Sequence, residues 1–256
     1  MKRYPISVKL CRFELKSEPG TIRSGMVYDG KIYETDGTEA IGVHEAADVR
    51  PLAPVPTPPS IRVFRTDLSE SGFVYANPAA VIGPSMVIEL PDTATDYVVR
   101  SFLGAVIGGA GYQLGDEEAE AVLLGFTLVN ILSSNSIEED DGKCVGRSQD
   151  FGIMVGPVIT TPDDLDDAMT PTENGIMYKL SASIKVNGDE KGFANFEAFS
   201  LSMVDAVKLA SETCTVRSGD LLCVGPIFED SACAVSKGDE FQFSMERLGM
   251  LSTKLG

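Results

Sequence analysis

The chain has 256 residues, of which 43% are apolar and 23% charged, which excludes a disordered chain, a collagen-like fibre and a coiled coil. Acidic residues outnumber basic ones by 38 to 21, so the net charge is −17. Phosphate backbones and anionic membranes attract clustered Lys and Arg, so this balance argues against a nucleic-acid partner and against a membrane partner.

Two further counts narrow the class of protein. The five cysteines are widely spaced and form no CxxC, and there is one histidine. The cysteine spacing favours reduced thiols in a cytoplasmic protein, and the single histidine excludes any site that needs two of them. No apolar run has the length of a signal peptide or of a membrane span.

Residues 1–50 predict a small β-rich domain. Short alternating runs are separated by Gly and Asp turn signals, and Asp29-Gly30 predicts the turn of a hairpin. His44 lies in this part, where we expect it in a surface loop. Residues 51–59 hold five prolines and predict an extended connector, because proline fixes φ and disfavours helix before it.

Residues 60–256 are again rich in strand-like runs, with few helical windows. Helices are predicted over 116–122 and 199–210, and a further helix start at Thr161-Pro162. The acidic run 138–141 predicts a solvated loop. The whole pattern predicts an α+β, β-dominated fold.

A series of short motifs runs in order along the chain. They are RPLAPVP at 50–56, NPAAVIGP at 77–84, DY at 96–97 with AVIG at 105–108, GFTLVN at 125–130, DFGIMVGP at 150–157, VNGD at 186–189, and SGD, VG and KGDE between 218 and 240. This series resembles the fumarylacetoacetate hydrolase family over nearly the whole chain. The resemblance implies a mixed β-roll catalytic domain at 60–256 and a homodimer.

Members of that family typically bind Mg²⁺ or Mn²⁺ through three carboxylates, ligands that suit hard dications. In the columns of those carboxylates this chain has Arg100, Phe102 and Ile131. Residues 97–111 contain no carboxylate, so a slip of the alignment does not restore the ligands. We therefore expect neither a metal nor another cofactor.

The same alignment supplies the candidate site residues. Arg100, in a metal-ligand column, is expected to be catalytic, although it could instead pair with a carboxylate to hold its strand. Arg147 keeps a positive charge where the family has one, so a functional role and a surface ion pair both stay open. Asp67 is a third candidate, as an acid or base. The expected substrate contacts are Phe102, Asn130, Ile131, Asp150 and Val224.

These residues predict a metal-independent enzyme for a bulky, largely apolar small molecule. Because water activation is lost, we expect a rearrangement, an elimination or a cyclisation, for example a pericyclic one, in specialised metabolite biosynthesis. One alternative is a Mg²⁺- or Mn²⁺-dependent C–C hydrolase, decarboxylase or tautomerase of an oxo acid with ligands relocated to residues such as Glu89, Asp96 or Asp150. The other is a non-catalytic binding protein.

Overall fold

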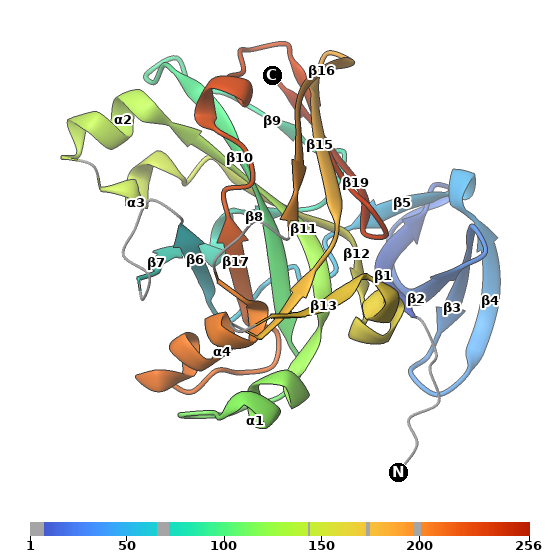
Figure 1. Ribbon diagram of the computed structural model, residues 1–256. Coiled ribbons are helices and arrows are strands. Elements are labelled where there is room, and N and C mark those ends of the chain that lie inside the picture. The colour runs from blue at the N-terminus through green and yellow to red at the C-terminus, as the bar shows by residue number, and fades with distance from the viewer. Residues whose placement is uncertain (1–7, 66–71, 143, 173–174, 197–200) are drawn as a thin grey trace.

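The structure is a computed structural model (Figure 1), and it describes residues 8–65, 72–142, 144–172, 175–196 and 201–256. The strands are β1 Lys9–Leu15, β2 Glu18–Tyr28, β3 Lys31–Thr35, β4 Ala40–Glu45, β5 Val49–Leu52, β6 Ile61–Arg65, β7 Val74–Ala76, β8 Val81–Ile82, β9 Val87–Ile88, β10 Tyr97–Ile107, β11 Leu123–Ser134, β12 Gly152–Thr160, β13 Met169–Thr172, β14 Gly175–Tyr178, β15 Ser181–Val186, β16 Asp189–Asn195, β17 Leu221–Gly225, β18 Glu240–Met245 and β19 Gly249–Leu255. The helices are α1 Asp116–Ala121, α2 Asn135–Asp140, α3 Val145–Ser148 and α4 Met203–Glu212, with 3-10 turns η1 Ala46–Asp48, η2 Pro78–Ala80, η3 Pro162–Ala168 and η5 Asp230–Ala232.

A large mixed sheet organises the molecule. Its strand order is β4-β3-β2-β1-β12-β11-β10-β17-β6-β7, with β5 paired to β1 and β8 to β12. Neighbours such as β10 and β11 are antiparallel, whereas β17 and β6 are parallel. A second sheet has the order β16-β15-β18-β19-β9. The predicted β-dominated α+β fold is confirmed.

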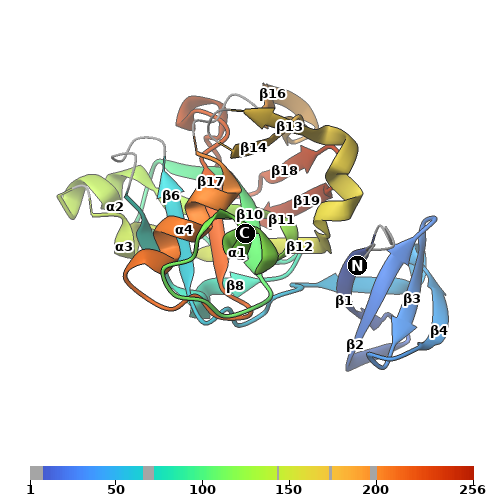
Figure 2. The ribbon, with the colours of Figure 1, turned by 60° about the horizontal axis from the view of Figure 1, so that its bottom comes forward.

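The N-terminal strands lie to one side of the molecule (Figure 2). They have a small core of their own, made of Cys11, Phe13, Ile32 and Val49. The predicted hairpin joins β2 to β3, and both turn residues, Asp29 and Gly30, have the positive φ that its tight turn requires. Strand β1 pairs with β12, so the main sheet continues into this unit. The boundaries 1–50 and 51–59 stay a prediction.

The expectation for His44 was wrong. It lies on β4, where its ring stacks at 5.5 Å from that of Phe13 and its Nε2 lies 2.7 Å from Glu34 Oε2. The alternating pattern of 40–45 was short, and the turn signals around it obscured a strand.

The central strands β10, β11 and β12 separate two hydrophobic cores. The first core, which includes Leu103, Phe126 and Met154, packs against the second sheet and α4. The second core, which includes Phe102, Ile131 and Ile153, lies on the other face of the main sheet. All eleven residues of β10 are buried because both of its faces are covered.

Of the three predicted helices, one holds, one begins later than predicted and one is a 3-10 turn. Helix α1 begins at Asp116, as predicted, and the Glu118 side chain accepts the Gly115 N–H at 3.1 Å. Helix α4 begins at Met203, later than predicted, because the Ser202 hydroxyl caps it by accepting the Asp205 N–H at 3.1 Å. The predicted positions 199–200 lie outside the described residues. The start at Thr161-Pro162 became η3.

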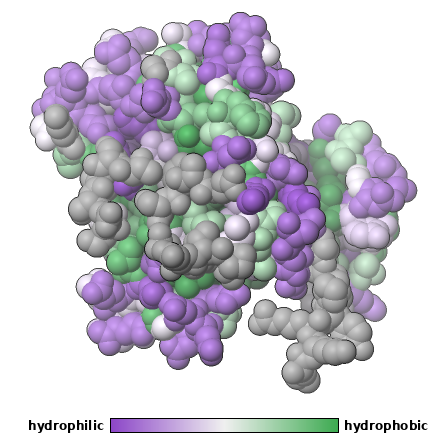
Figure 3. Space-filling view, viewed as in Figure 1, coloured by the Kyte–Doolittle hydropathy of each residue, from purple (hydrophilic) through white to green (hydrophobic). Residues whose placement is uncertain are grey.

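The acidic run was wrongly expected to be a solvated loop. It falls largely in α2, which the Ser134 hydroxyl caps and which Ile137 anchors by burial. Figure 3 shows hydrophilic residues over this corner of the molecule. Within the described residues, every helix is too short or too polar to cross a membrane.

Candidate functional site

The residues in the family's metal-ligand columns lie on one face of the central sheet. In the β10–β11 ladder Arg100 pairs with Ile131 and Phe102 with Val129. Because side chains alternate along a strand, Arg100, Phe102 and Ile131 face the second core. Asn130, one step away, faces the first core. The sheet therefore brings three of the predicted residues together and separates the fourth from them.

The Arg100 guanidinium is held by four hydrogen bonds. Its Nε donates to Asp230 Oδ1 at 3.0 Å and its Nη2 to Asp230 Oδ2 at 2.7 Å. Its Nη1 donates to Glu138 Oε2 at 3.0 Å, and Nη2 also donates to Asn135 Oδ1 at 2.8 Å. A guanidinium has five N–H groups, so one hydrogen, on Nη1, is left over. Strand β10, helix α2 and turn η5 are thus joined at one cation.

This network is partly buried. The Arg100 side chain is 5% exposed, that of Glu138 16% and that of Asp230 36%. Burial alone would lower the pKa of Arg100, but hydrogen bonds to Asp230 and the charges of Asp230 and Glu138 outweigh it and raise the pKa. Glu138 also reaches Arg65, whose Nη1 lies 3.4 Å from Oε1. The site therefore holds two guanidiniums and two carboxylates in a fixed arrangement.

Apolar side chains form the floor beside Arg100. Phe102, Ile131 and Ile153 are fully buried in the second core. The last residue of β17, Gly225, passes so close that a Cβ there would lie 2.9 Å from the Phe102 ring. Phe102 and Ile131 were expected to contact substrate, and both are enclosed by protein atoms.

A polar pair lies on the opposite face. Ser101 Oγ donates to Asn130 Oδ1 at 2.8 Å, and both residues are fully buried. Within the described residues, Asn130 Nδ2 has no hydrogen-bond partner. Val224, another expected contact, is also buried on this side, in the first core. These two residues do not join Arg100.

The remaining predicted residues lie apart from the network. Arg147 is 62% exposed, and its Nε and Nη2 bind Asp141 at 3.0 and 2.6 Å. That carboxylate raises the pKa of Arg147, and Arg147 in turn lowers the pKa of Asp141. Of the two possibilities, the structure has the surface ion pair. Asp150 is exposed, and Asp67 lies outside the described residues.

The donor set does not fit a divalent metal. The three columns hold a cation, an aromatic ring and an aliphatic chain, none of which coordinates a hard dication. Among the described residues, no three His, Cys, Asp or Glu side chains are grouped as metal ligands would be. Glu89, Asp96 and Asp150, suggested as relocated ligands, are therefore not assembled into one.

Sequence analysis missed the three other charged members of the network. Asp230 lies 130 positions from Arg100 along the chain, and nothing local marks it. Glu138 was assigned to a loop, although a cap signal at Ser134 precedes it. Arg65, at the end of β6, pairs in register with Gly225.

Comparison with known proteins identifies the protein family. Residues 60–255 match the family model "Fumarylacetoacetate (FAA) hydrolase C-terminal". The chain belongs to the fumarylacetoacetate hydrolase family. The match begins directly after the proline-rich segment, and it covers β6 to β19.

The curated relatives have several activities. A 2,4-didehydro-3-deoxy-L-rhamnonate hydrolase of Sphingomonas sp. (strain SKA58) is 25% identical over 94% of both chains. A mitochondrial oxaloacetate tautomerase Fahd2a of Rattus norvegicus is 25% identical over 69% of this chain, which spans 56% of the relative's length. The chain thus spans little more than half of some relatives and nearly all of another.

The fold has close counterparts among solved structures. A 2-hydroxyhepta-2,4-diene-1,7-dioate isomerase from Mycobacterium marinum aligns with a TM-score of 0.82 and 24% identity, over 97% of this chain and 98% of that one. A fumarylacetoacetate hydrolase from Exiguobacterium antarcticum aligns with a TM-score of 0.79 and 21% identity, over 97% and 99%. At these identities the likeness establishes the fold alone.

Proposed function

We propose that this chain is a metal-independent enzyme that rearranges a small organic molecule without adding water. The observation that carries the proposal is Arg100, a permanent cation in a column where the family has a metal ligand, fixed by Asp230 and Glu138. The family comprises enzymes, and the similar proteins named above include an isomerase, a tautomerase and a hydrolase.

The chemistry available to the site follows from its charges. A guanidinium stays protonated at any working pH, and one N–H of Arg100 remains available. A fixed donor of this kind stabilises negative charge that develops on a substrate oxygen, as an isomerisation or elimination requires. The carboxylates of Asp230 and Glu138 are occupied by guanidiniums, so they are poorly placed to activate water.

The proposed substrate is bulky and largely apolar, and the proposed reaction includes cyclisation in specialised metabolite biosynthesis. The fully apolar floor formed by Phe102, Ile131 and Ile153 supports a largely apolar substrate. For such a substrate to reach Arg100, neighbouring side chains must move, because Phe102 and Ile131 are enclosed.

A non-catalytic binding protein is the second candidate. It is favoured by the same enclosure and by the nearly complete hydrogen bonding of Arg100. The metal-dependent alternative lacks an assembled ligand set among the described residues.

A mass-resolved incubation tests the proposal. The purified protein, dialysed against EDTA, is incubated with a small-molecule extract of its source organism, with heat-inactivated protein as the control. We expect a substrate to be consumed and a product of equal mass, or one lighter by a small neutral molecule, to appear. Two smaller products whose masses sum to that of the substrate plus one water, formed only after Mg²⁺ or Mn²⁺ is restored, would establish the metal-dependent hydrolase instead.

A further inference from the structure

A pocket of about 280 Å³ opens on the far side of the sheet from Arg100. It lies between the start of β11, turn η3, strand β14 and the start of α4. Leu124 and Met169 contribute apolar wall, and Tyr178 contributes its ring. The carboxylates that line it are Glu120, Asp163 and Asp166, and its described lining residues include no Lys, Arg or His. We name it the Tyr178 pocket.

Turn η3 carries four aspartates, two of which form ion pairs and two of which line the pocket. Asp164 lies 3.8 Å from Lys9 Nζ, and Asp167 is bound by Arg247, with 2.6 Å between Oδ2 and Nη2. Asp163 and Asp166, which line the pocket, form no ion pair within the described part of the chain, and neither does Glu120. Three carboxylates at the pocket therefore lack a counter-charge that their neighbours have.

Tyr178 provides an independent sign of a ligand. It is 6% exposed, and its ring packs edge-on against Phe126 with 4.9 Å between centroids. Its hydroxyl makes no hydrogen bond to any described residue, and its oxygen is open to the space of the pocket. Burial raises the pKa of this hydroxyl, and the charges of Glu120 and Asp166 raise it further, which places the oxygen in the field of the pocket.

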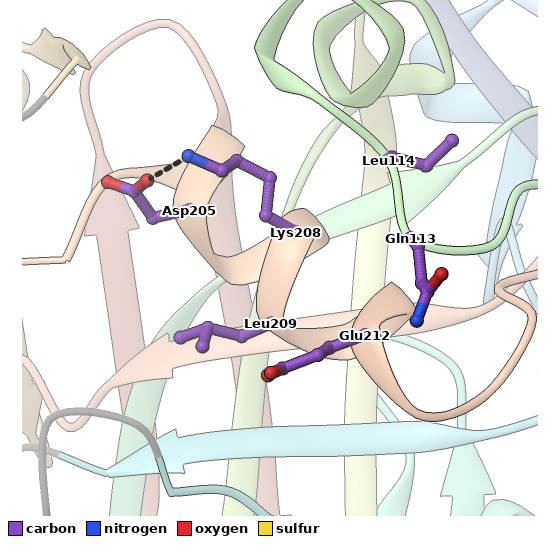
Figure 4. A pocket seen from close by; sticks show the side chains of 6 residues that line it. All are labelled: Gln113, Leu114, Asp205, Lys208, Leu209 and Glu212. Atoms are coloured by element: carbon purple, nitrogen blue, oxygen red, sulfur yellow. Dashed lines mark hydrogen bonds and ion pairs between the residues drawn. The ribbon is translucent and has the colours of Figure 1, made fainter.

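In a second pocket, the carboxylates are balanced by a lysine of the protein itself (Figure 4). It measures about 560 Å³ and lies along α4, lined by Asp205, Lys208 and Glu212. There Lys208 binds Asp205 at 3.3 Å and Asp116 at 2.7 Å, so a cation of the protein already balances the carboxylates. The Tyr178 pocket has no such balance.

We propose that the Tyr178 pocket binds a small organic ammonium ion. The apolar walls take its alkyl part, the Tyr178 hydroxyl accepts a hydrogen bond from the ammonium group, and the carboxylates balance its charge. A bare dication fits less well, because no three metal-ligating side chains of the described residues are grouped closely enough to hold one.

Calorimetric titration with butylammonium chloride tests the site at constant ionic strength, with butanol and sodium butyrate as neutral and anionic probes of similar size. We expect butylammonium alone to bind. The double variant Glu120→Gln/Asp166→Asn should weaken binding about tenfold, since each of these exposed charges contributes modestly. The variant Tyr178→Phe, which removes one oxygen, should weaken it about threefold, as expected for one lost hydrogen bond.

A matched control loses the same charge elsewhere. The double variant Glu117→Gln/Glu139→Gln changes two exposed carboxylates outside the pocket and should bind butylammonium like the unmodified protein. Equal binding of butanol, or equal weakening in the control variant, would overturn the proposal. A third outcome would also overturn it: the unmodified protein is a dimer that binds no probe, and the variant Glu120→Gln/Asp166→Asn is a monomer. The occupant of the pocket would then be a second copy of the chain.

Discussion

At the scale of single residues, the proposed function would give Arg100 both of the roles that the sequence left as alternatives. Its ion pairs tie three elements together, and its remaining N–H is the donor that the proposed chemistry uses. A buried ion pair contributes little over an apolar replacement, but the loss of one partner strands the other charge. Stability and turnover should therefore both depend on this side chain.

The variant Arg100→Met keeps the apolar stem and removes the charge. We expect the free energy of unfolding to fall by about 2–3 kcal/mol, less than for a fully buried pair because water reaches Asp230, which is 36% exposed. Turnover of a substrate found by the incubation above should fall about a hundredfold, which corresponds to about 2.7 kcal/mol.

Urea unfolding and initial rates measure the two effects. Arg147→Met is the control, because it breaks an exposed pair with Asp141 and should leave both nearly unchanged. Normal turnover by a destabilised Arg100→Met would assign Arg100 a structural role only.

The buried thiols should make stability depend on alkaline pH. Burial raises the pKa of Cys11 to about 11 and that of Cys233 to about 12, and it raises the pKa of Cys223 as well, from a reference of 9.0. Above about pH 9 the unfolded chain loses thiol protons that the folded chain keeps, so stability present below pH 9 is lost as pH rises.

Each buried thiol should contribute about 1.4 kcal/mol per pH unit to that loss. Chemical unfolding between about pH 9 and 11 checks it: Cys223→Ala should flatten the slope by this amount. Cys144→Ala, at an exposed thiol, should not change the slope. A slope that Cys223→Ala leaves unaltered would contradict the assignment.

At the scale of elements, one charged side chain of helix α2, that of Glu138, binds two strands of the main sheet. Glu138 contacts Arg100 with one oxygen and Arg65 with the other, which joins α2 to β10 and β6. The adjacent Glu139 is exposed. The two neighbours thus differ in surroundings and not in chemistry, which makes them a matched pair.

We expect Glu138→Gln to speed amide hydrogen exchange across 135–140, because the helix loses its charged attachment. Glu139→Gln should leave the exchange of α2 as it is. Mass spectrometry of proteolytic fragments measures both. Equal exchange in the two variants would show that the burial of Ile137 and the hydrogen bond from Arg100 to Asn135 hold the helix without Glu138.

Elements were largely predictable where the signal was local. The Asp29-Gly30 turn, the start of α1 and the shared face of Arg100, Phe102 and Ile131 follow from turn chemistry, charge near a helix start and strand alternation. The contact between Arg100 and Asp230 could not be predicted in this way, because the two residues are 130 positions apart along the chain. The start of α4 moved because a serine cap decided it rather than hydrophobic spacing.

At the scale of the whole molecule, the two sheets leave strand edges exposed. Strand β4 ends the main sheet and β16 ends the second one. Exposed edges favour pairing with another chain, and natural proteins cover or protect them. Together with the family resemblance, this supports the prediction of a homodimer.

Light scattering coupled to size exclusion should give twice the 27.3 kDa of one chain at micromolar concentration. Adding salt should not halve that mass, since a stable homodimer rests mainly on buried apolar surface. A mass of one chain throughout the micromolar range would reject the dimer.

The pairing of Arg100 also restricts how this protein can evolve. Replacing Arg100 by glutamate would put a carboxylate in a column where, by the resemblance, the family has a metal ligand, yet it would set a third carboxylate against Asp230 and Glu138. Phe102 and Ile131 would still occupy the other two columns, inside a packed core. Each single substitution of this kind should therefore lower stability without completing a set of three carboxylates, so a metal site at these columns would require several changes at once.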